Sequence, residues 1–552
     1  ANNGTTDFAT YTPGWISGDV SSISGNPAFI APNGSASTVD LHISPSVPTV
    51  IESAGIPLAS VTDDFDSQTR ASFTPTDMGA DAGNFVVMDI SAPVISYTPL
   101  LAACGTGDVL LAGVNIIDGT GVPTTGTLRP RIYYRKGAGA WFSQPGTLSS
   151  GTGTNGFWNF TMVAADMGGL ATGDVIQYYV IAQDNVVPAN ISSNPSGAVA
   201  TDVNTVTTPP ATPNSITVQG ILSGNYNVGV GQTYATVTAA INAYNTSCIN
   251  GPITFTLMDA TYPTETFPIN INQAVGGSST NTLTIKPAPG VNPVITGSSS
   301  SGIININGAD FVTIDGSNGS GTNSICPLVQ ASRNLSIINT NTAASTAGIF
   351  IGSTASGNSA TNVTVKNCII QSGVNTVQTT YGIFMGGSSI GSAGADNDNL
   401  TLENNDISRA LVGITVLGSS LATNHDNLNI RLNSIGSNTA ANYIPFQGIN
   451  LSFAQGANIE SNKIFNINSA TYFTNSGNSG IEVGSTMGNA KILKNDIANV
   501  QMTASPSSGW GAWGINVNTG TANDNILMAN NTISGISTGL AWLRIRSAAR
   551  LS

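Results

Sequence analysis

The chain has 552 residues, of which only 8% are charged, and its formal net charge is −13 at pH 7. These numbers argue against nucleic acid as a partner, because binding it needs clustered Lys and Arg, and the 16 such residues are scattered. Charged residues make up about a quarter of ordinary globular domains. A surface this poor in charge is typical of extracellular β-proteins and unusual for cytosolic enzymes. No apolar run reaches transmembrane length, so membrane insertion is not expected.

The four cysteines show no CxxC spacing, which argues against zinc and thioredoxin-type sites. A disulfide is possible, but the spacing assigns no pairing. The chain starts with Ala-Asn-Asn and shows no signal peptide, which indicates a mature or excised segment of an extracellular protein. The cysteines are Cys104, Cys248, Cys326 and Cys368.

Residues 1–90 alternate short apolar runs with Pro, Gly and Asp turns. Their acidic run, Asp63, Asp64 and Asp66, offers oxygen ligands that suit Ca²⁺. The favoured interpretation is a solvated turn with Arg70 as its ion partner.

Residues 91–206 hold short strand patterns separated by Gly-rich turns, a spacing typical of an all-β sandwich. The run Asp174–Asp184 resembles an inner strand of immunoglobulin-like or fibronectin-III domains. Trp141 and Trp158 could form an exposed platform for sugars, but core packing is favoured, since small sandwiches commonly bury a tryptophan. The expected strands are Val94–Tyr97, Val109–Ile117, Arg131–Arg135, Trp158–Val163 and Val175–Gln183.

The Pro-rich run within residues 207–224 predicts a short, stiff linker. Residues 225–300 then carry the chain's one helical pattern, Tyr234–Asn245. We expect this helix to be an N-terminal cap over the first coils of the repeat that follows. Its apolar face is Val237, Ala240, Ile241 and Tyr244.

Residues 301–552 contain one pattern repeated every 31 to 35 residues, which indicates a solenoid. Apolar residues alternate within each unit, as in Ile349–Ile351, and this is the period of strands. Two or three short strands per unit describe one coil of a parallel β-helix, in which each coil pairs with the next. A Gly-Ile pair recurs at Gly348, Gly382, Gly413, Gly448, Gly480 and Gly514.

An asparagine recurs in the same units and is followed two residues later by isoleucine, first at Ile369. We expect the asparagines to stack in register and to hydrogen-bond along the solenoid, while the isoleucines fill its interior. The predicted structural ladder is Asn367, Asn405, Asn433, Asn462, Asn495 and Asn531.

Four runs within residues 220–535 follow a known pattern: Tyr234–Ile241, Gly251–Leu257, Asn281–Pro287 and Gly308–Gly316. Through them this region resembles the right-handed parallel β-helices of the pectin-lyase-like superfamily, and more narrowly the β-helix modules of very large secreted bacterial surface proteins. The resemblance implies an all-β chain, a right-handed parallel β-helix solenoid preceded by an immunoglobulin-like β-sandwich. It also implies that residues 1–90 are the terminal coil or cap of a preceding module, and that residues 301–552 break off inside the next one.

Enzymes of this architecture commonly place their chemistry on the outer face of one parallel sheet. Lyases need a strong base beside calcium-binding carboxylates, and hydrolases need paired carboxylates. The outward positions of the Gly-Ile strand offer one carboxylate, Glu482, and no base. These positions are Phe350, Phe384, Thr415, Asn450, Glu482 and Asn516.

Three further features have competing interpretations. A second outward row alternates in charge and is expected to balance itself, and His425 is expected in a solvent-exposed turn. No cofactor is expected other than Ca²⁺, for which Asp396 and Asp398 offer oxygen ligands, although they lack the EF-hand pattern. Phe350 and Phe384 are expected to form an exposed aromatic contact patch, unless a loop within 386–399 covers them. The alternating row is Lys366, Glu403, Arg431 and Glu460.

These observations favour a non-enzymatic modular protein, extracellular or at the cell surface, that acts in adhesion, surface assembly or glycan binding. Glycans or cell-surface components would be its partners. The alternative is a secreted polysaccharide lyase or glycoside hydrolase of the β-helix type, with Glu482 as its catalytic residue.

Overall fold

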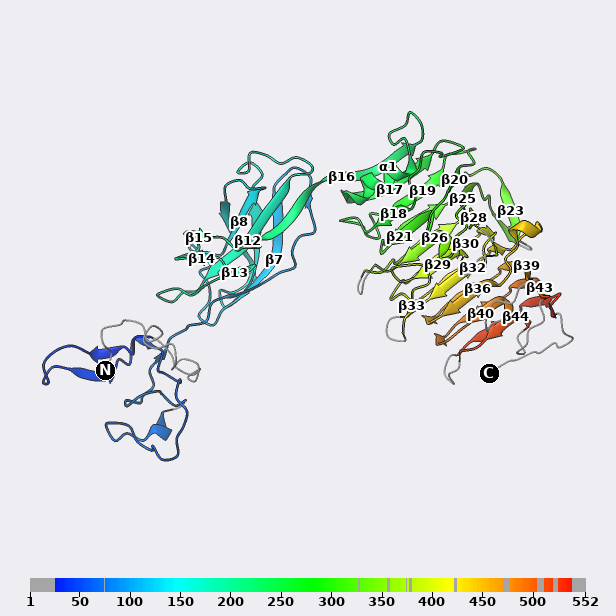
Figure 1. The fold of residues 1–552 in the computed structure, drawn as a ribbon. Helices are drawn as coiled ribbons and strands as arrows, with labels where there is room; N and C mark the ends of the chain where they lie inside the picture. Colours follow the sequence, from blue (N-terminus) through cyan, green and yellow to red (C-terminus); the bar gives the residue numbers. More distant parts are fainter. Residues whose placement is uncertain are drawn as a thin grey trace. The chain divides into compact units, whose positions relative to one another are not determined.

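The chain forms two compact units in the computed structural model (Figure 1). The first lies within residues 1–215, and the second runs from Ile216 onward and also takes in Leu101–Gly107 and Gly169–Val175. Residues 539–552, the end of the region predicted to form coils, lie outside the described residues. The structure describes residues 25–73, 75–325, 328–354, 358–373, 375–376, 380–420, 424–469, 477–503, 511–519 and 525–538.

The first unit begins with short strands joined by turns. β1 pairs antiparallel with β2, and β3 pairs parallel with β4. That this region ends a preceding module stays a prediction. The elements are β1 (Phe29–Ala31), β2 (Asp40–Ile43), β3 (Pro48–Thr49), the 3₁₀ helix η3 (Arg70–Ser72) and β4 (Val86–Val87).

Two antiparallel sheets form the rest of the first unit. One has the order β10-β11-β7-β5, and the other places β12 between β8 and β13, with β9 beyond β8. β11 contacts β8 and β9, and β5 contacts β13, so the sheets face each other. The strands are β5 (Val94–Ser96), β7 (Val109–Ile117), β8 (Arg131–Lys136), β9 (Phe142–Pro145), β10 (Thr147–Gly151), β11 (Asn155–Met162), β12 (Val175–Gln183), β13 (Ile191–Asn194), β14 (Val199–Ala200) and β15 (Val206–Thr208).

The five strands predicted in this region are therefore present, with bounds shifted by at most a few residues. Trp158 is fully buried, which confirms its predicted core packing. Trp141 packs edge-on against Tyr179, with ring centroids 5.1 Å apart, and the Arg135 guanidinium lies 4.5 Å from its ring centroid. The likeness to immunoglobulin-like domains stays a prediction.

The second unit is a parallel β-solenoid in which successive coils stack through three long sheets (Figure 1). Each typical coil passes through sheet 1, then sheet 2, then sheet 3. Sheet 1 contains β16 (Asn214–Val228), β17 (Ser247–Leu257), β19 (Leu283–Pro287), β22 (Val312–Asp315), β27 (Thr364–Lys366), β30 (Thr401–Glu403), β34 (Asn429–Arg431), β38 (Asn458–Glu460), β42 (Lys491–Leu493) and β45 (Leu527–Ala529).

Sheets 2 and 3 complete the coils. Sheet 2 contains β20 (Val294–Gly297), β25 (Leu335–Asn339), β28 (Cys368–Gln371), β31 (Asp406–Ser408), β35 (Ser434–Ile435), β39 (Lys463–Ser469), β43 (Asp496–Met502), β46 (Thr532–Ser534) and β47 (Ser537–Thr538). Sheet 3 contains β18 (Ile269–Asn272), β21 (Ile304–Asn307), β26 (Thr346–Gly352), β29 (Thr380–Gly386), β32 (Val412–Leu417), β36 (Gln447–Ser452), β40 (Asn478–Val483) and β44 (Ala512–Val517).

Small elements decorate the solenoid. β6 pairs in parallel with β16, and β33, β37 and β41 form a short parallel sheet of their own. These elements are β6 (Ala103–Cys104), β23 (Thr322–Ile325), β24 (Leu328–Ala331), β33 (His425–Asp426), β37 (Ala454–Gln455), β41 (Met487–Gly488) and the 3₁₀ helix η4 (Ala440–Asn442).

The helix predicted over Tyr234–Asn245 is present as α1 (Val237–Asn245), three residues shorter at its start, and its buried residues are the four predicted. Its role as an N-terminal cap stays a prediction. Thr236 caps the helix, because its side chain accepts a hydrogen bond from the Ala239 amide. The Glu265 carboxylate accepts hydrogen bonds from the first two amides of the helix. This placement is favourable, because the helix dipole attracts a negative charge to the N-terminus. By contrast, the linker predicted over residues 207–224 is too long, because β16 already begins at Asn214.

The two repeated motifs form one packing unit. A Cβ at Gly448 would lie 2.6 Å from Ile464 Cγ2 and 2.5 Å from the Gly480 carbonyl oxygen, so only glycine fits where sheet 3 begins. Ile464, which leaves no room for a side chain at Gly448, is the isoleucine of sheet 2 that follows the repeated asparagine. The same contact recurs, at 2.3–2.6 Å, between Gly348 and Ile370, Gly382 and Ile407, Gly413 and Ile435, Gly480 and Ile497, and Gly514 and Ile533.

The asparagine ladder is confirmed for five of its six members. At each step, the backbone amide and the side-chain amide of one asparagine both donate to the Oδ1 of the next, at 2.9–3.1 Å. Each side-chain amide also donates to a backbone carbonyl, as Asn433 does to Leu402 at 2.8 Å. The ladder therefore provides hydrogen-bond partners for backbone amide and carbonyl groups at the corner between sheets 1 and 2. Its members are Asn405, Asn433, Asn462, Asn495 and Asn531.

Asn367 is not part of the ladder, so that prediction is wrong by one residue. Its neighbour Cys368 occupies the position, because the Cys368 amide donates to Asn405 Oδ1 at 3.0 Å. Asn367 instead takes the left-handed corner position, with a φ of 60°, and accepts a hydrogen bond from Asn404. The interior residue of this coil is consequently Ile370 and not Ile369.

Candidate functional site

The outer row of sheet 3 is the surface on which chemistry was expected. The six predicted positions do lie in one row, because strand pairing sets Phe350 opposite Phe384, and Glu482 opposite both Asn450 and Asn516. Phe384 also pairs with Thr415, and Thr415 pairs with Asn450, so each of the six residues is opposite the next. We call these six residues the outer row.

The aromatic end of the outer row is covered, so the predicted exposed patch is wrong. Phe350 is 3% exposed and Phe384 is fully buried. Their ring centroids lie 6.0 Å apart, and Tyr381 and Ile390 pack against them. Alternation correctly sends both rings outside the coil, but Ile390 belongs to the segment after β29 that folds back over them. The alternative of a covering loop therefore holds.

An open hollow of about 480 Å³ borders Phe350. Phe350 and Ile390 contribute apolar surface to it, and the rest of its lining is dominated by hydroxyl and amide groups. Such groups match the hydroxyls of a sugar. The polar lining includes Ser301, Asn305, Asn307, Ser345, Ser388 and Ser389. Sequence alternation identifies the outward Asn305 and Asn307, but not the serines that loops bring beside them.

Glu482 is the single carboxylate of the outer row and is only 9% exposed. Asn516 Nδ2 donates to its Oε1 at 2.8 Å, while its Oε2 is buried with no hydrogen-bond donor among the described residues. Burial raises the pKa of Glu482 to about 7, and the hydrogen bond from Asn516 acts in the opposite sense. A carboxyl group with this pKa can exchange a proton near neutral pH. Its neighbours in the row, Asn450 and Asn516, offer amides and not a second carboxylate.

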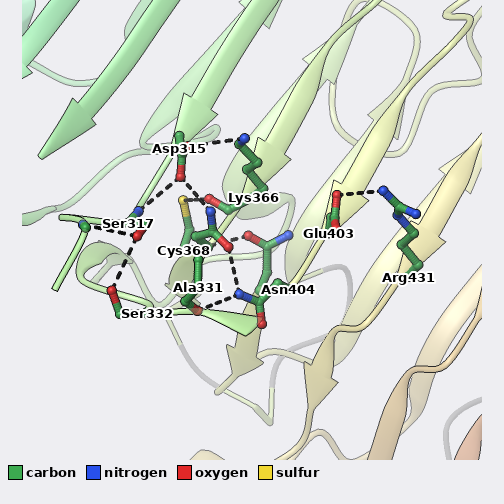
Figure 2. Close-up of polar contacts among 12 residues, drawn as sticks. Asp315, Ser317, Ala331, Ser332, Lys366, Cys368, Glu403, Asn404 and Arg431 are labelled. Atoms are coloured by element: carbon green, nitrogen blue, oxygen red, sulfur yellow. Dashed lines mark hydrogen bonds and ion pairs between the residues drawn. The ribbon is translucent and has the colours of Figure 1, made fainter. Parts of the chain in front are cut away.

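Ion pairs neutralise the outward row of sheet 1, but within the predicted row only Glu403 and Arg431 pair with each other (Figure 2). Lys366 lies 3.2 Å from Asp315, and Arg431 lies 3.1 Å from Glu403. Further along, Lys494 from the adjoining corner lies 3.0 Å from Glu460. These pairs are partly exposed, and such pairs each contribute about 0.2–1 kcal/mol. The bases of this row are thus engaged in neighbour-to-neighbour pairs, which fits a structural role.

The predicted calcium site at Asp396 and Asp398 is not assembled as a group of three carboxylates. Asp398 Oδ1 accepts the Asp426 amide at 2.7 Å. Burial, together with the negative charges of Asp426 and Asp396, raises the pKa of Asp398. Calcium binding there stays a prediction. Among the described residues, two other sets of three acidic side chains have oxygens within 4.8 Å of one another: Asp64, Asp66 and Asp81, and Asp89, Asp118 and Asp184.

The first of these sets adjoins a histidine and not the predicted arginine. His42 Nε2 lies 2.7 Å from Asp66 Oδ2, and its Nδ1 lies 2.6 Å from Asp40 Oδ1. Arg70 donates instead to the backbone carbonyls of Asp63, Gly79 and Ala80. The interpretation of Arg70 as the ion partner of the acidic run is therefore wrong.

His425 is fully buried in β33, so its predicted place in an exposed turn is wrong. β33 pairs in parallel with β37, and this encloses the ring. The backbone amide of Asn397 donates to His425 Nδ1 at 3.1 Å, which requires Nδ1 to be unprotonated. Burial lowers the pKa of His425 to about 4.

The chain's two histidines are expected to titrate on opposite sides of pH 6.5. Hydrogen bonds with Asp40 and Asp66 raise the pKa of His42 to about 9, so its stabilising effect is complete below pH 6.5 and is lost as the pH rises through 9. For His425 the stabilising effect is complete above pH 6.5 and is lost as the pH falls to about 4. NMR titration of labelled histidine rings, assigned with His42→Gln, measures both. Titration midpoints between pH 6 and 7 for both rings would contradict the ion pairs of His42 and the burial of His425.

No family model matches the sequence, and no curated protein matches it either. The structure is similar to a surface adhesin of Streptococcus pneumoniae, PfbA, with 12% identity over 58% of this chain and 78% of that one, at a TM-score of 0.28. It is also similar to a pectin methylesterase from Aspergillus niger, with 13% identity over 56% of this chain and 90% of that one, at a TM-score of 0.18.

A third similar structure is the A-module of the mannuronan C-5 epimerase AlgE6 from Azotobacter vinelandii, with 14% identity over 54% of this chain and 94% of that one, at a TM-score of 0.20. Scores this low carry no argument, so the assignment of a parallel solenoid rests on the strand pairing described above. Within the described residues, no helix is both long and apolar enough to cross a membrane.

Proposed function

We propose that this chain belongs to an extracellular modular protein that binds glycans without transforming them. The solenoid serves as a rigid spacer, and the hollow beside sheet 3 serves as the contact surface. The observation that carries the proposal is this hollow, whose hydroxyl and amide lining beside Phe350 suits sugar hydroxyls and an apolar sugar face. The disulfide between Cys104 and Cys248 supports an extracellular location, because disulfides persist in oxidising compartments.

A second candidate function is that of a secreted polysaccharide lyase or glycoside hydrolase. The observation in its favour is Glu482, a buried carboxyl on the outer row whose pKa is raised to about 7. General acids in enzymes are tuned in this way. The weaker point is its surroundings, because glycosidases commonly use two carboxyl groups on either side of the scissile bond. Asn450 and Asn516 flank Glu482 in the row instead.

A glycan array tests the proposed function. The purified chain is expected to bind a defined subset of glycans, and Ser388→Trp is expected to weaken this binding at least tenfold by filling the exposed rim of the hollow. Ser279→Trp, at another exposed serine of the solenoid, is the matched control and is expected to bind normally. Both variants are expected to keep the melting temperature of the parent chain.

Binding that Ser388→Trp leaves intact, or binding to no glycan at all, would remove the hollow from consideration. The same preparations are incubated with pectin and alginate, from which we expect no unsaturated or reducing sugars. Reproducible turnover that disappears in Glu482→Gln would favour the enzyme over the binding protein.

A further inference from the structure

Three aspartates of the first unit meet where strands of both its sheets end. Asp118 directly follows β7, and Asp184 directly follows β12. Asp89 precedes β5, whose first residue pairs with the last residue of β7. The strands thus deliver three carboxylates, distant in sequence, to one place. Each contributes an oxygen to a group in which all such atoms lie within 4.8 Å of one another.

Two of these carboxylates have an oxygen that nothing in the described chain satisfies. Asp118 is 6% exposed, and its Oδ1 accepts both the amide and the hydroxyl of Thr120 at 3.0 Å. Its Oδ2 is buried without a hydrogen-bond donor. Asp89 repeats the arrangement, since its Oδ1 accepts the Ser91 amide at 2.9 Å and its Oδ2 is buried without a donor.

The free oxygen of Asp89 lies beside the turn that contains Asp118. A Cβ built on Gly119 would lie 3.8 Å from Asp89 Oδ2, so that oxygen faces the turn that begins at Asp118. Asp184 is 1% exposed and is held by Asn190, whose amide and side chain donate to its two oxygens at 2.9 and 2.6 Å. Asp184 Oδ1 also accepts the Val186 amide at 3.3 Å, whereas Oδ2 accepts only from Asn190 and keeps a second lone pair for another ligand.

The charge of this cluster has no counterpart in the described chain. No Lys, Arg or His among the described residues forms an ion pair with Asp89, Asp118 or Asp184. Buried carboxylates are costly unless they are paired or coordinate a metal. The cluster of Asp64, Asp66 and Asp81 differs on both counts, since Asp66 pairs with His42 and none of its oxygens is buried without a partner.

We propose that Asp89, Asp118 and Asp184 bind a divalent cation, and that this ion is Ca²⁺. The candidate ligands are all carboxylate oxygens, which suits a hard cation and not zinc, whose usual ligands are Cys and His. Ca²⁺ accepts irregular oxygen cages, whereas Mg²⁺ demands a near-ideal octahedron and retains its waters. The ion would fasten the segment before β5 to the ends of β7 and β12, and would so brace the first unit.

Calcium titration of the whole chain tests this site. After dialysis against EDTA, millimolar CaCl₂ is expected to raise the melting temperature by at least about 3 °C, because an ion that binds only the folded state stabilises it. Calorimetry is expected to give a Kd of about 10⁻⁴ M, a value common in extracellular modules. Asp118→Asn is the diagnostic variant. It is expected to abolish the response to calcium and to leave the melting temperature in EDTA unchanged or higher, since it removes one of three crowded charges.

Asp66→Asn is the matched control, because it alters the other acidic cluster, and it is expected to retain the full response. The proposal is overturned if CaCl₂ has no effect on the parent chain, or if Asp118→Asn responds as the parent does. A response lost in Asp66→Asn would place the ion at the other cluster and so also overturn it. An equal response to MgCl₂ would overturn the assignment of Ca²⁺. Glycan binding by the solenoid is measured separately, so failure of either proposal can be told from failure of the other.

Discussion

Replacing Asn433 by Leu is expected to lower the free energy of unfolding of the solenoid by about 2–6 kcal/mol. Asn433 Oδ1 is the acceptor for the buried backbone amide of Asn405, and its Nδ2 donates to the Leu402 carbonyl. The substitution strands both groups in a corner from which water is excluded. Leaving one buried group unsatisfied costs about 1–3 kcal/mol, and here two groups are affected. Urea unfolding followed by circular dichroism measures the difference.

Asn429→Leu provides the matched control, since it makes the same substitution on the neighbouring strand β34. Asn429 lies on an outward position of sheet 1, and the equivalent position on β45 is already Leu527. We expect a change within about 0.5 kcal/mol, as for most surface substitutions. Equal destabilisation by the two variants would show that the ladder does not contribute more than a surface amide.

The ladder also shows how far the sequence predicts the solenoid. Period and alternation are properties of every coil, so they survive local irregularity and predict the sheets well. The Asn367 error is local. Where the corner residue must adopt a positive φ, Asn is favoured, so an asparagine can stand directly beside the ladder position. Val365, three residues before Cys368, would have given the correct alignment, because an apolar residue stands three places before every other ladder member.

Coverage of the outer face could not be predicted from alternation. Alternation states on which side of a strand a side chain lies, but not what the connecting segments place above it. Phe350 and Phe384 are outward and buried because Ile390 returns over them. His425 was misplaced for a related reason, since its enclosure depends on a short sheet formed with strands one and two coils away.

The acidic cluster of the first unit was missed because its members are distant in sequence. The signal that was available is modest. Asp118 and Asp184 each follow a strand pattern directly and precede Gly or Asn. Such positions also suit ordinary turns. Only the pairing of β5 with β7 brings Asp89 to the same place, and strand pairing of this kind cannot be predicted from one sequence.

Removing the disulfide between Cys104 and Cys248 is expected to lower the free energy of unfolding by about 2–5 kcal/mol. The two cysteines are 144 positions apart, and the closure of a loop this long restricts the unfolded chain strongly. In the folded solenoid the bond fastens β6 to β17, on either side of β16. Cys248 is buried at the start of β17, so the bond ties β6 to the interior of the first coil. The variant for this test replaces both cysteines by Ala, which leaves no new free thiol.

Urea unfolding with and without reductant separates the effect of the bond from that of the side chains. The parent chain is expected to lose stability in reductant, whereas the double variant is expected to be indifferent to it. Cys368 stays available as an internal control, because it is a buried free thiol whose pKa is raised by burial and which should resist alkylation until the solenoid unfolds. A parent chain whose midpoint does not move in reductant, with the thiols of Cys104 and Cys248 shown to be free, would contradict the prediction. The β6 segment would then depend on its strand pairing with β16 alone, and the disulfide would no longer support an extracellular location.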